Sequence, residues 1–367
     1  MKRYIKMVAA LLTLMASFTA CENGDQAFDD YEGGTKVMFT YQSPVRTIVL
    51  GDDEYDTSID KEHKCKIKAT FSGSYNGRKG YVNVAVDNSL CDHLTFADGT
   101  PVKAMPAEYY SLSTNKLEFK GGMTGETVVQ LTDAFFNDPK AIENTYVIPL
   151  LMTNVKGIDH ILTGKPREGL TPVRQNTSEW DILAKDYVLY CVKYKNPWDA
   201  KYIRRGVDNV TEKGVTNTVV RKDFSLVNSD LEHYKENPVN QNDEVCGINT
   251  KNMTQAIFPV SFKTSGASVP CNLILTFNGD KCTISTDDEG VTVSGEGEFI
   301  EKGTERIEYK DYQWGSNNGK PVQRDILRLS YNVNFADKDI QVSTNDTLVV
   351  QTRESNKREF FSPKYVK

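Results

Sequence analysis

The chain has 367 residues, with 44 basic and 50 acidic side chains and a formal net charge of −6. This acidic balance argues against nucleic acid as a partner and against adhesion to an anionic membrane through protein charge. The length predicts two domains, each large enough to bury a core of its own.

The first 20 residues have the pattern of a lipoprotein signal peptide. Three basic residues precede an apolar run from Met7 to Ala16, and Cys21 follows two small residues. The apolar run is shorter than the roughly 20 residues that cross a bilayer. We therefore expect cleavage after residue 20 and acylation at Cys21, with a transmembrane helix or a plain secreted protein as the alternatives.

Residues 21–35 form an acidic, glycine-containing stretch that predicts a solvated tether. Loss of residues 1–20 removes three basic and no acidic side chains, which takes the formal charge from −6 to −9. Attachment to a membrane then depends on the acyl chains. The acidic residues after Cys21 resemble the surface-export signal of Bacteroidetes lipoproteins, and that resemblance implies an outer-membrane protein at the cell surface.

Residues 36–157 are expected to form an all-β, Ig-like sandwich. No sustained 3.6-residue apolar period occurs, and short β-rich runs recur between turn residues. Such runs in about 125 residues are typical of a β-sandwich with Greek-key connections. The expected strands span residues 36–41, 46–50, 63–71, 80–87, 109–112, 116–120, 126–131 and 145–152.

Residues 158–180 hold several glycines and prolines among polar residues, which predicts a linker. Residues 181–357 then carry longer strands, beginning with 187–194 and 201–206. Asn278-Gly279-Asp280 predicts a tight turn between two alternating strands. Sequential hairpins favour a lipocalin-like (calycin-like) up-and-down barrel, with a second sandwich as the alternative and residues 358–367 as a tail.

Several strings resemble known Bacteroidetes lipoprotein domains. RTIVLGDDEYD, KIKATFSGSYNGRKGYVNVAVDNSL and TYVIPLLMTNVKGID resemble an N-terminal sandwich domain of unknown function that also precedes the barrel of some family 18 endo-glycosidase-like proteins. EWDILAKDYVLYCVKYKNPWDAKYIRRGVD resembles the start of an accompanying C-terminal domain of unknown function. The resemblance implies a polysaccharide-utilisation system, an outer-membrane glycan importer complex as partner, and glycan binding at the cell surface.

Sequence signatures of catalysis are missing. The chain has no H-E-x-x-H, G-x-S-x-G, P-loop or Rossmann fingerprint. A family 18 glycosidase needs a parallel α/β barrel with clustered acids, and neither is predicted here. The acid runs at Asp52–Glu54 and Asp287–Glu289 are typical of solvated turns. We therefore expect a protein that is not an enzyme and that has no cofactor.

The cysteines after residue 21 show no C-x-x-C and no regular spacing. Cys271 and Cys282 flank a predicted hairpin, so a disulfide between them is left open. His63 with Cys65, and Cys91 with His93, could supply four zinc ligands if their strands were adjacent. Packing of Cys65 in the core is the favoured interpretation, and we expect no metal site.

Glycan recognition uses exposed aromatic faces flanked by amides and carboxylates. The densest such stretch runs from Tyr309 to Asn318, at a predicted hairpin tip. Trp198, near Tyr202 and Arg204, is a second candidate, although a role as a plug of the barrel core is favoured for it. The candidate glycan-binding residues are Tyr309, Asp311, Tyr312, Trp314, Asn317 and Trp198.

The sequence thus predicts a non-catalytic, lipid-anchored glycan-binding protein of the cell surface, with a polysaccharide or oligosaccharide as partner. A structural adhesin or fimbrial-type lipoprotein is the alternative. An enzyme on a barrel scaffold would need acids converging in a pocket. Exposed aromatic platforms favour glycan binding, and a strand-exchange groove favours the adhesin.

Overall fold

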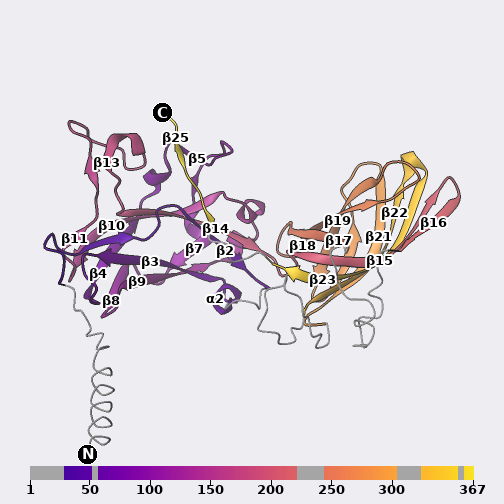
Figure 1. Ribbon diagram of the computed structural model, residues 1–367, viewed down its shortest axis with the longest axis horizontal. Coiled ribbons are helices and arrows are strands. Elements are labelled where there is room, and N and C mark those ends of the chain that lie inside the picture. The colour runs from indigo at the N-terminus through magenta and orange to yellow at the C-terminus, as the bar shows by residue number, and fades with distance from the viewer. Residues whose placement is uncertain (1–28, 52–56, 221–243, 304–323, 354–358) are drawn as a thin grey trace, which may run out of the picture.

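The protein is all-β, as predicted, and consists of two β-sheet units (Figure 1). The computed structural model describes residues 29–51, 57–220, 244–303, 324–353 and 359–367. Among these residues, no helix is long and apolar enough to cross a membrane.

The N-terminal unit contains two curled sheets that face each other. The first has the strand order β11-β1-β3-β9-β7, and the second has the order β24-β2-β14-β10-β4-β8, with β6 beside β10. The strands of the first sheet are β1 (Lys36–Phe39), β3 (Lys64–Ser72), β7 (Tyr110–Leu112), β9 (Thr124–Leu131) and β11 (His160–Ile161). Those of the second are β2 (Pro44–Val49), β4 (Lys79–Val86), β6 (Lys103–Ala104), β8 (Lys116–Lys120), β10 (Tyr146–Lys156), β14 (Tyr187–Lys195) and β24 (Glu359–Phe360).

Short elements complete this unit. The two-stranded sheets pair β12 (Lys165–Pro166) with β13 (Trp180–Ile182), and β5 (Leu94–Thr95) with β25 (Lys364–Tyr365). The helices α2 (Ser58–Lys61) and α3 (Asp133–Phe136) are one turn long.

The second sheet is buried on both faces, because β10 and β14 contribute side chains to two cores. Ile148 and Val188 pack between the two sheets, whereas Val147 and Leu189 pack on the opposite side. A strand buried on both faces reads as a continuous apolar run, as in YVIPLLM and YVLYCV.

Three chain segments lie elsewhere than the sequence predicts. The strand expected at 187–194 to open the second unit is β14, which pairs with β10 and β2 of the first. The expected linker, 158–180, contributes β11, β12 and Trp180 to the N-terminal unit. The expected tail, 358–367, pairs with β2 and β5 through β24 and β25, and Figure 1 shows it returning over that unit.

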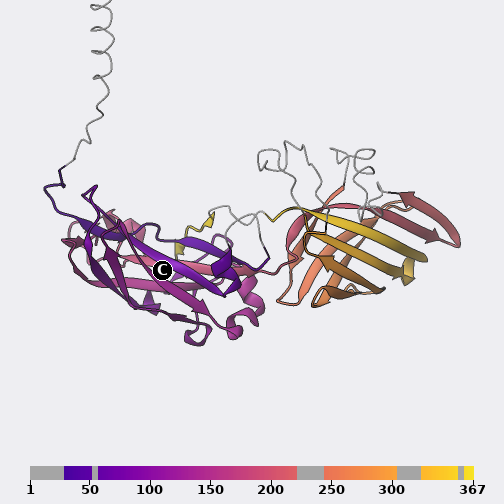
Figure 2. The same cartoon turned by 90° about the horizontal axis from the view of Figure 1, so that it is seen from below.

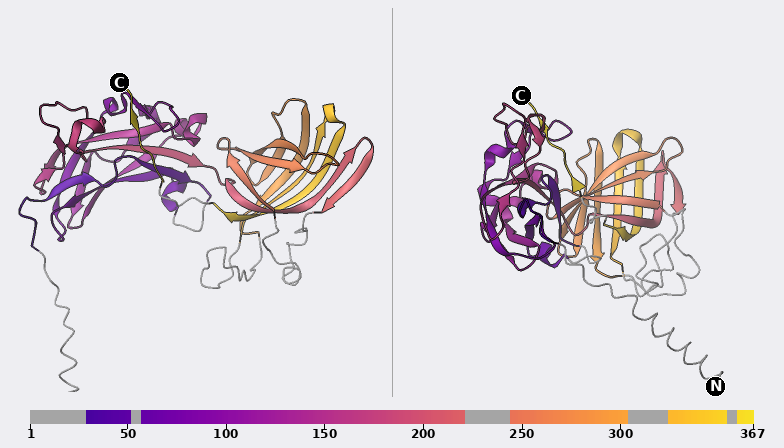
Figure 3. Two further views of the ribbon diagram at one scale, coloured as in Figure 1. Left: turned by 45° about the horizontal axis from the view of Figure 1, so that its top comes forward. Right: turned by 60° about the vertical axis from the view of Figure 1, so that its left-hand side comes forward.

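The C-terminal unit is a closed antiparallel barrel (Figures 2 and 3). Its sheet has the order β16-β15-β17-β18-β19-β20-β21-β22-β23, and a further pairing of β15 with β23 closes the ring. β17 and β16 pair with successive stretches of β15, residues 200–204 and 207–212. The strands are β15 (Ala200–Glu212), β16 (Val215–Val220), β17 (Glu244–Thr250), β18 (Gln255–Phe262), β19 (Val269–Asn278), β20 (Lys281–Ser285), β21 (Val291–Ile300), β22 (Ile326–Phe335) and β23 (Ile340–Thr352).

The barrel core follows from the alternation of buried and exposed residues along strands such as β22. In β22, five side chains point inward and are buried: Leu327, Leu329, Tyr331, Val333 and Phe335. Ser330 and Asn332, on the opposite face, are exposed. Such alternation fixes which face of each strand is inside.

The two units meet where the chain leaves β14. Asn196 is 1% exposed, and its backbone amide donates to Thr250 Oγ1 at 3.0 Å. Its side-chain amide donates to the carbonyls of Asn252 and Gln255 at 2.9 Å each. The crossing is therefore held by buried hydrogen bonds against the turn between β17 and β18.

Candidate functional site

Most sequence-predicted site residues lie outside the described part of the chain. Residues 1–28 include Cys21, and residues 304–323 include Tyr309, Asp311, Tyr312, Trp314 and Asn317. These predictions stay predictions.

Trp198 lies in the barrel core. Its side chain is 8% exposed, and its ring stacks on Phe277 with centroids 3.7 Å apart and planes 5° apart. Tyr202 is fully buried and donates its hydroxyl hydrogen to the Trp198 carbonyl at 2.8 Å. Trp198 thus has the plug role that the sequence favoured and does not present an open face to a glycan.

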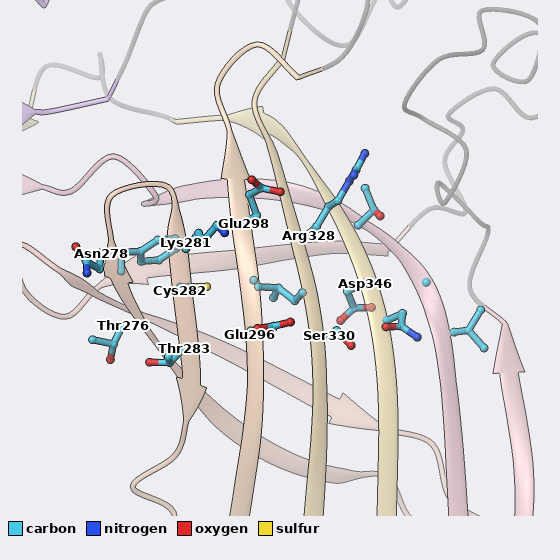
Figure 4. Close-up of a pocket in the computed structure, with 17 residues that line it drawn as sticks. Thr276, Asn278, Lys281, Cys282, Thr283, Glu296, Glu298, Arg328, Ser330 and Asp346 are labelled. Atoms are coloured by element: carbon cyan, nitrogen blue, oxygen red, sulfur yellow. The ribbon is translucent and has the colours of Figure 1, made fainter.

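A polar hollow of about 1000 Å³ lies on the outer face of the barrel, across β15 and β19–β23 (Figure 4). Its lining side chains that point outward carry hydroxyl, amide or charged groups, apart from one valine. They are Val207, Thr276, Asn278, Lys281, Thr283, Glu296, Glu298, Arg328, Ser330, Asn345 and Thr347.

The strand register places these side chains in two rows across the sheet. In the first row, Lys281 pairs with Glu298, Glu298 with Arg328, and Arg328 with Thr347. In the second row, Thr283 pairs with Glu296, Glu296 with Ser330, and Ser330 with Asn345. Directly opposed side chains are neighbours about 5 Å apart at Cβ, so each row is a continuous polar strip.

The charges of the hollow balance. Among the outward side chains, the carboxylates Glu296 and Glu298 stand beside the cations Lys281 and Arg328, while the inward Asp346 pairs with Arg204. Because opposite charges alternate along the first row, the surface presents both donors and acceptors without a strong net field.

A smaller hollow of about 380 Å³ continues the polar surface along the same strands. Its outward side chains are Asn209, Thr211, Thr292, Ser294, Asn332, Asn334, Gln341 and Ser343. Amides and hydroxyls therefore cover the outer face of β21–β23 well beyond the larger hollow.

Two glycines let the wall of the hollow curl tightly. Gly295 and Gly297 face the barrel interior on β21, and a Cβ atom at position 295 would stand 2.4 Å from Tyr331 Cβ. A Cβ atom at 297 would stand 2.5 Å from Leu329 Cδ2. Only glycine permits this approach of neighbouring strands, since strand glycines mark bends and close backbone contacts.

A buried polar cluster supports the wall from inside. Arg204 Nε lies 3.0 Å from Asp346 Oδ2, and Arg204 Nη2 lies 3.1 Å from the Tyr331 hydroxyl. Tyr331 donates to the same Asp346 oxygen at 2.8 Å, and Arg204 Nη1 donates to Glu244 at 3.1 Å. This cluster joins β15, β17, β22 and β23 through one guanidinium.

Burial acts on the pKa values of this cluster. Burial alone lowers the pKa of Arg204, but Tyr331, Asp346 and Glu244 outweigh it, so the pKa stands above its ordinary range. Burial first, and then Asp346, raises the pKa of Tyr331 well above its usual value. Arg204 is therefore charged and Tyr331 neutral across the accessible pH range, which keeps the cluster intact.

The hollow is suited to hydrogen bonding rather than to stacking. Its one aromatic lining residue, within the described chain, is Phe277, which is buried against Trp198. Amide, hydroxyl, carboxylate and guanidinium groups can bind a ligand rich in hydroxyls. The sequence signal was the alternation in TVSGEGEF, LRLSYNVN and QVSTND, but the register that aligns these runs is not readable from it.

The remaining candidates are structural in the described chain. Cys65 lies in the core between the two sheets and Cys91 in the core on the other side of the second sheet, so their histidine pairs do not converge. Cys271 and Cys282 are free, buried thiols on neighbouring strands. In the described residues no group of three or more His, Cys, Asp or Glu side chains converges as a metal site would require.

Comparison with known proteins identifies both units. Residues 197–354 match the family described as Domain of unknown function (DUF5627), and residues 31–159 match a family of N-terminal domains. A crystal structure of unknown function from Bacteroides ovatus is 38% identical, with a TM-score of 0.79, and the match covers 92% of this chain and 100% of that one. The chain belongs to the family of that Bacteroides ovatus protein.

Two other structures are only remotely similar. A multidomain protein including DUF1735 from Bacteroides ovatus is 10% identical with a TM-score of 0.37, over 89% of this chain and 99% of that one. A Bacteroides ovatus ATCC 8483 protein, described provisionally as carbohydrate binding, is 10% identical with a TM-score of 0.27, over 88% and 99%. Both scores are too low to carry an argument. Among curated proteins, none matches this chain.

Proposed function

We propose that this protein is a non-catalytic, lipid-anchored glycan-binding protein of the cell surface, part of a polysaccharide-utilisation system. The observation that carries the proposal is the outer hollow of the barrel, where the two polar rows offer donors and acceptors of both signs over about 1000 Å³. That volume lies at the upper end of the roughly 300–1,000 Å³ usual for small-ligand sites. We include in this proposal that the N-terminal unit is an Ig-like sandwich and that the C-terminal unit is a lipocalin-like barrel.

The sequence between β21 and β22 holds the aromatic residues that belong to the same proposal. β21 ends at Ile300 and β22 begins at Ile326, so the stretch with Tyr309, Tyr312 and Trp314 joins the strands that carry Glu298 and Arg328. Hydroxyl hydrogen bonds alone gain little in water, because water competes for them, and a flat apolar face supplies affinity.

The hollow is tested by removing one opposed charge pair. The double variant Glu298→Ala, Arg328→Ala keeps the net charge and should weaken binding about tenfold, measured as retardation in gels cast with amylopectin, xylan or galactomannan. The matched control is Lys251→Ala, Asp287→Ala, which removes an exposed ion pair of 2.7 Å outside the hollow. Equal binding by both double variants would contradict the proposed site.

Trp314→Ala tests the aromatic stretch. If the ring is exposed, its removal should weaken polysaccharide binding about tenfold and leave the melting temperature unchanged. A large fall in melting temperature instead would place the ring in a core and remove it from the site.

The anchor is tested separately. Cys21→Ala should leave the protein unprocessed or in the soluble fraction, because the thiol is the acylation point. Unchanged partitioning into the detergent phase would contradict the anchor and leave the glycan site untouched.

The adhesin remains the second candidate because of β16. Among the described strands β16 pairs only with β15, and its Val215 and Val220 are 62% and 65% exposed. Such a strand can receive a partner strand. Concentration-dependent polymers of the mature chain, abolished by Val219→Pro, would favour this function over glycan binding.

A further inference from the structure

An aromatic hollow in the N-terminal unit has no role in the proposed barrel site. It measures about 670 Å³ and lies where the chain enters β1 and leaves β3. Tyr31 and Tyr75 line it and are 66% and 78% exposed. Two large aromatic side chains held in water beside a hollow are unusual, since tyrosine faces are normally packed away.

The backbone that carries Tyr31 is fixed. The Tyr31 amide donates to the Gly73 carbonyl at 2.8 Å, and Gly34 donates to the Tyr31 carbonyl at 2.9 Å. Asp30, next to Tyr31, forms an ion pair with Arg78. The two tyrosine-bearing segments are therefore tied to each other, so little conformational entropy is lost when a ligand contacts both.

Further bonds hold the end of this segment. The Thr35 amide and hydroxyl donate to Asp159 Oδ2 at 2.7 and 2.8 Å. The tyrosine segment is thus anchored to the chain that precedes β11 as well as to the end of β3.

Glycines shape the platform. A Cβ atom at Gly33 would stand 2.3 Å from Tyr31 Cε1, so the tyrosine ring lies directly over that residue. Gly73 has a φ of +89°, and a Cβ atom there would stand 2.7 Å from the Gly34 carbonyl oxygen. The side chain of a larger residue at position 33 would therefore collide with the Tyr31 ring in its present position.

Polar groups of both signs surround the rings. Asp29 and Lys36 bring one negative and one positive charge, and Ser72 and Ser74 bring hydroxyls. Lys36 and Ser72 are register partners on β1 and β3, so these groups stand side by side at the rim. A balanced rim does not select an anion or a cation, and it suits a neutral ligand that has apolar faces and many hydroxyls.

We propose that the Tyr31–Tyr75 hollow is a second carbohydrate site, which stacks a neutral pyranose of a polysaccharide chain on its tyrosine faces while the charged and hydroxyl rim binds the sugar hydroxyls. It lies in the N-terminal unit, apart from the barrel hollow, and it supplies the exposed stacking faces that the described part of the barrel hollow does not. This inference shares with the proposed function only the class of ligand.

The test uses the full mature chain in gels cast with amylopectin, xylan or galactomannan. The double variant Tyr31→Ala, Tyr75→Ala should lose about tenfold or more in affinity for the polysaccharide that retards the unaltered chain most. Tyr31→Phe and Tyr75→Phe should bind almost normally, because phenylalanine keeps the face. Gly33→Ala should weaken binding by displacing the Tyr31 ring, with the melting temperature unchanged.

Tyr41→Ala is the matched control. Among the described residues of this unit, Tyr41 is the other exposed tyrosine, at 46%, but it packs on Phe360 and does not line the hollow. If the double tyrosine variant is retarded as strongly as the unaltered chain, this inference is wrong and the proposed function still stands. Retardation that survives Glu298→Ala, Arg328→Ala but not the tyrosine variant overturns the barrel site alone. No retardation of the unaltered chain in any gel overturns both.

Discussion

At the scale of single residues, Arg204 is a buried cation of the barrel with bonds to three other strands. It is 1% exposed, binds Asp346 and Tyr331, and lies with its guanidinium carbon 5.3 Å from the Phe258 ring centroid. One side chain thus holds strands that are far apart in sequence.

Arg204→Met should lower the free energy of unfolding by about 3–5 kcal/mol, because it leaves buried carboxylates without their cation. Tyr331→Phe removes one hydroxyl bonded to Asp346 and should cost less, about 1–2 kcal/mol. Urea denaturation at pH 7 measures both changes. A loss below 1 kcal/mol for Arg204→Met would show that the cluster is not structural.

Cys65 makes a pH-dependent contribution to stability. Burial raises its pKa from 9.0 to about 12. Since the folded state holds this proton more tightly than the unfolded state, the contribution is complete below pH 9 and is lost as the pH rises from 9 toward 12. We expect the unfolding free energy of the native protein to fall over this range more steeply than that of Cys65→Ala.

The same burial predicts inert thiols. Cys65 should not react with a thiol reagent at pH 8 until the protein is unfolded. Rapid labelling of Cys65 in the native state, located by peptide mapping, would contradict its placement between the two sheets.

At the scale of elements, alternation is what the sequence reveals best. Period-2 patterns predict strands at residues 281–286 and 325–335, and the structure has β20 at Lys281–Ser285 and β22 at Ile326–Phe335. The prediction works because one face of each strand is buried and the other faces solvent. The run at 187–195 is buried on both faces, so its pattern identifies a strand but not the unit to which it belongs.

Composition predicts a linker at residues 158–180, but this segment pairs and packs with the N-terminal unit. Glycine and proline indicate turns, but they do not show whether turns pack on a core. Here Trp180 is buried, and its indole nitrogen donates to the Val173 carbonyl at 3.0 Å. The barrel hollow was equally hidden, because Glu296 and Asn345 become neighbours of Ser330 only through a register that the sequence does not state.

A substitution at Gly295 tests the close approach of β21 to β22. Gly295→Ala should cost about 1–3 kcal/mol, because its Cβ atom would collide with Tyr331 and with the Ser330 carbonyl, 2.5 Å away. Gly266→Ala is the control, since the nearest atom to its Cβ would be Thr264 Oγ1 at 4.0 Å. Equal melting temperatures for the two variants would contradict the close approach of β21 and β22.

At the scale of the whole molecule, the N-terminal unit is built from both ends of the chain. β24 pairs with β2, and Phe361 and Tyr365 pack against the core that also contains Trp180. The barrel is therefore inserted between β14 and β24 of a unit that is completed only when the last residues return.

Limited proteolysis should reflect this arrangement. Residues 158–180 should resist cleavage, because they pair with β1 and cover a core. Early cleavage within 158–180 that leaves two stable fragments would restore the linker that the sequence suggested. Removal of residues 354–367 should make this segment cleavable, because the core it covers loses Phe361 and Tyr365.

Insertion of the barrel has a mechanical consequence. β15 and β23 are register neighbours from Lys201 with Thr352 to Glu212 with Ile340, and both connect to the N-terminal unit at the same end. A pull between the two units therefore enters the barrel through two adjacent strands at once, not through a single flexible thread. Tension is shared along the whole β15–β23 ladder, and rotation of one unit about the other must twist two chains together.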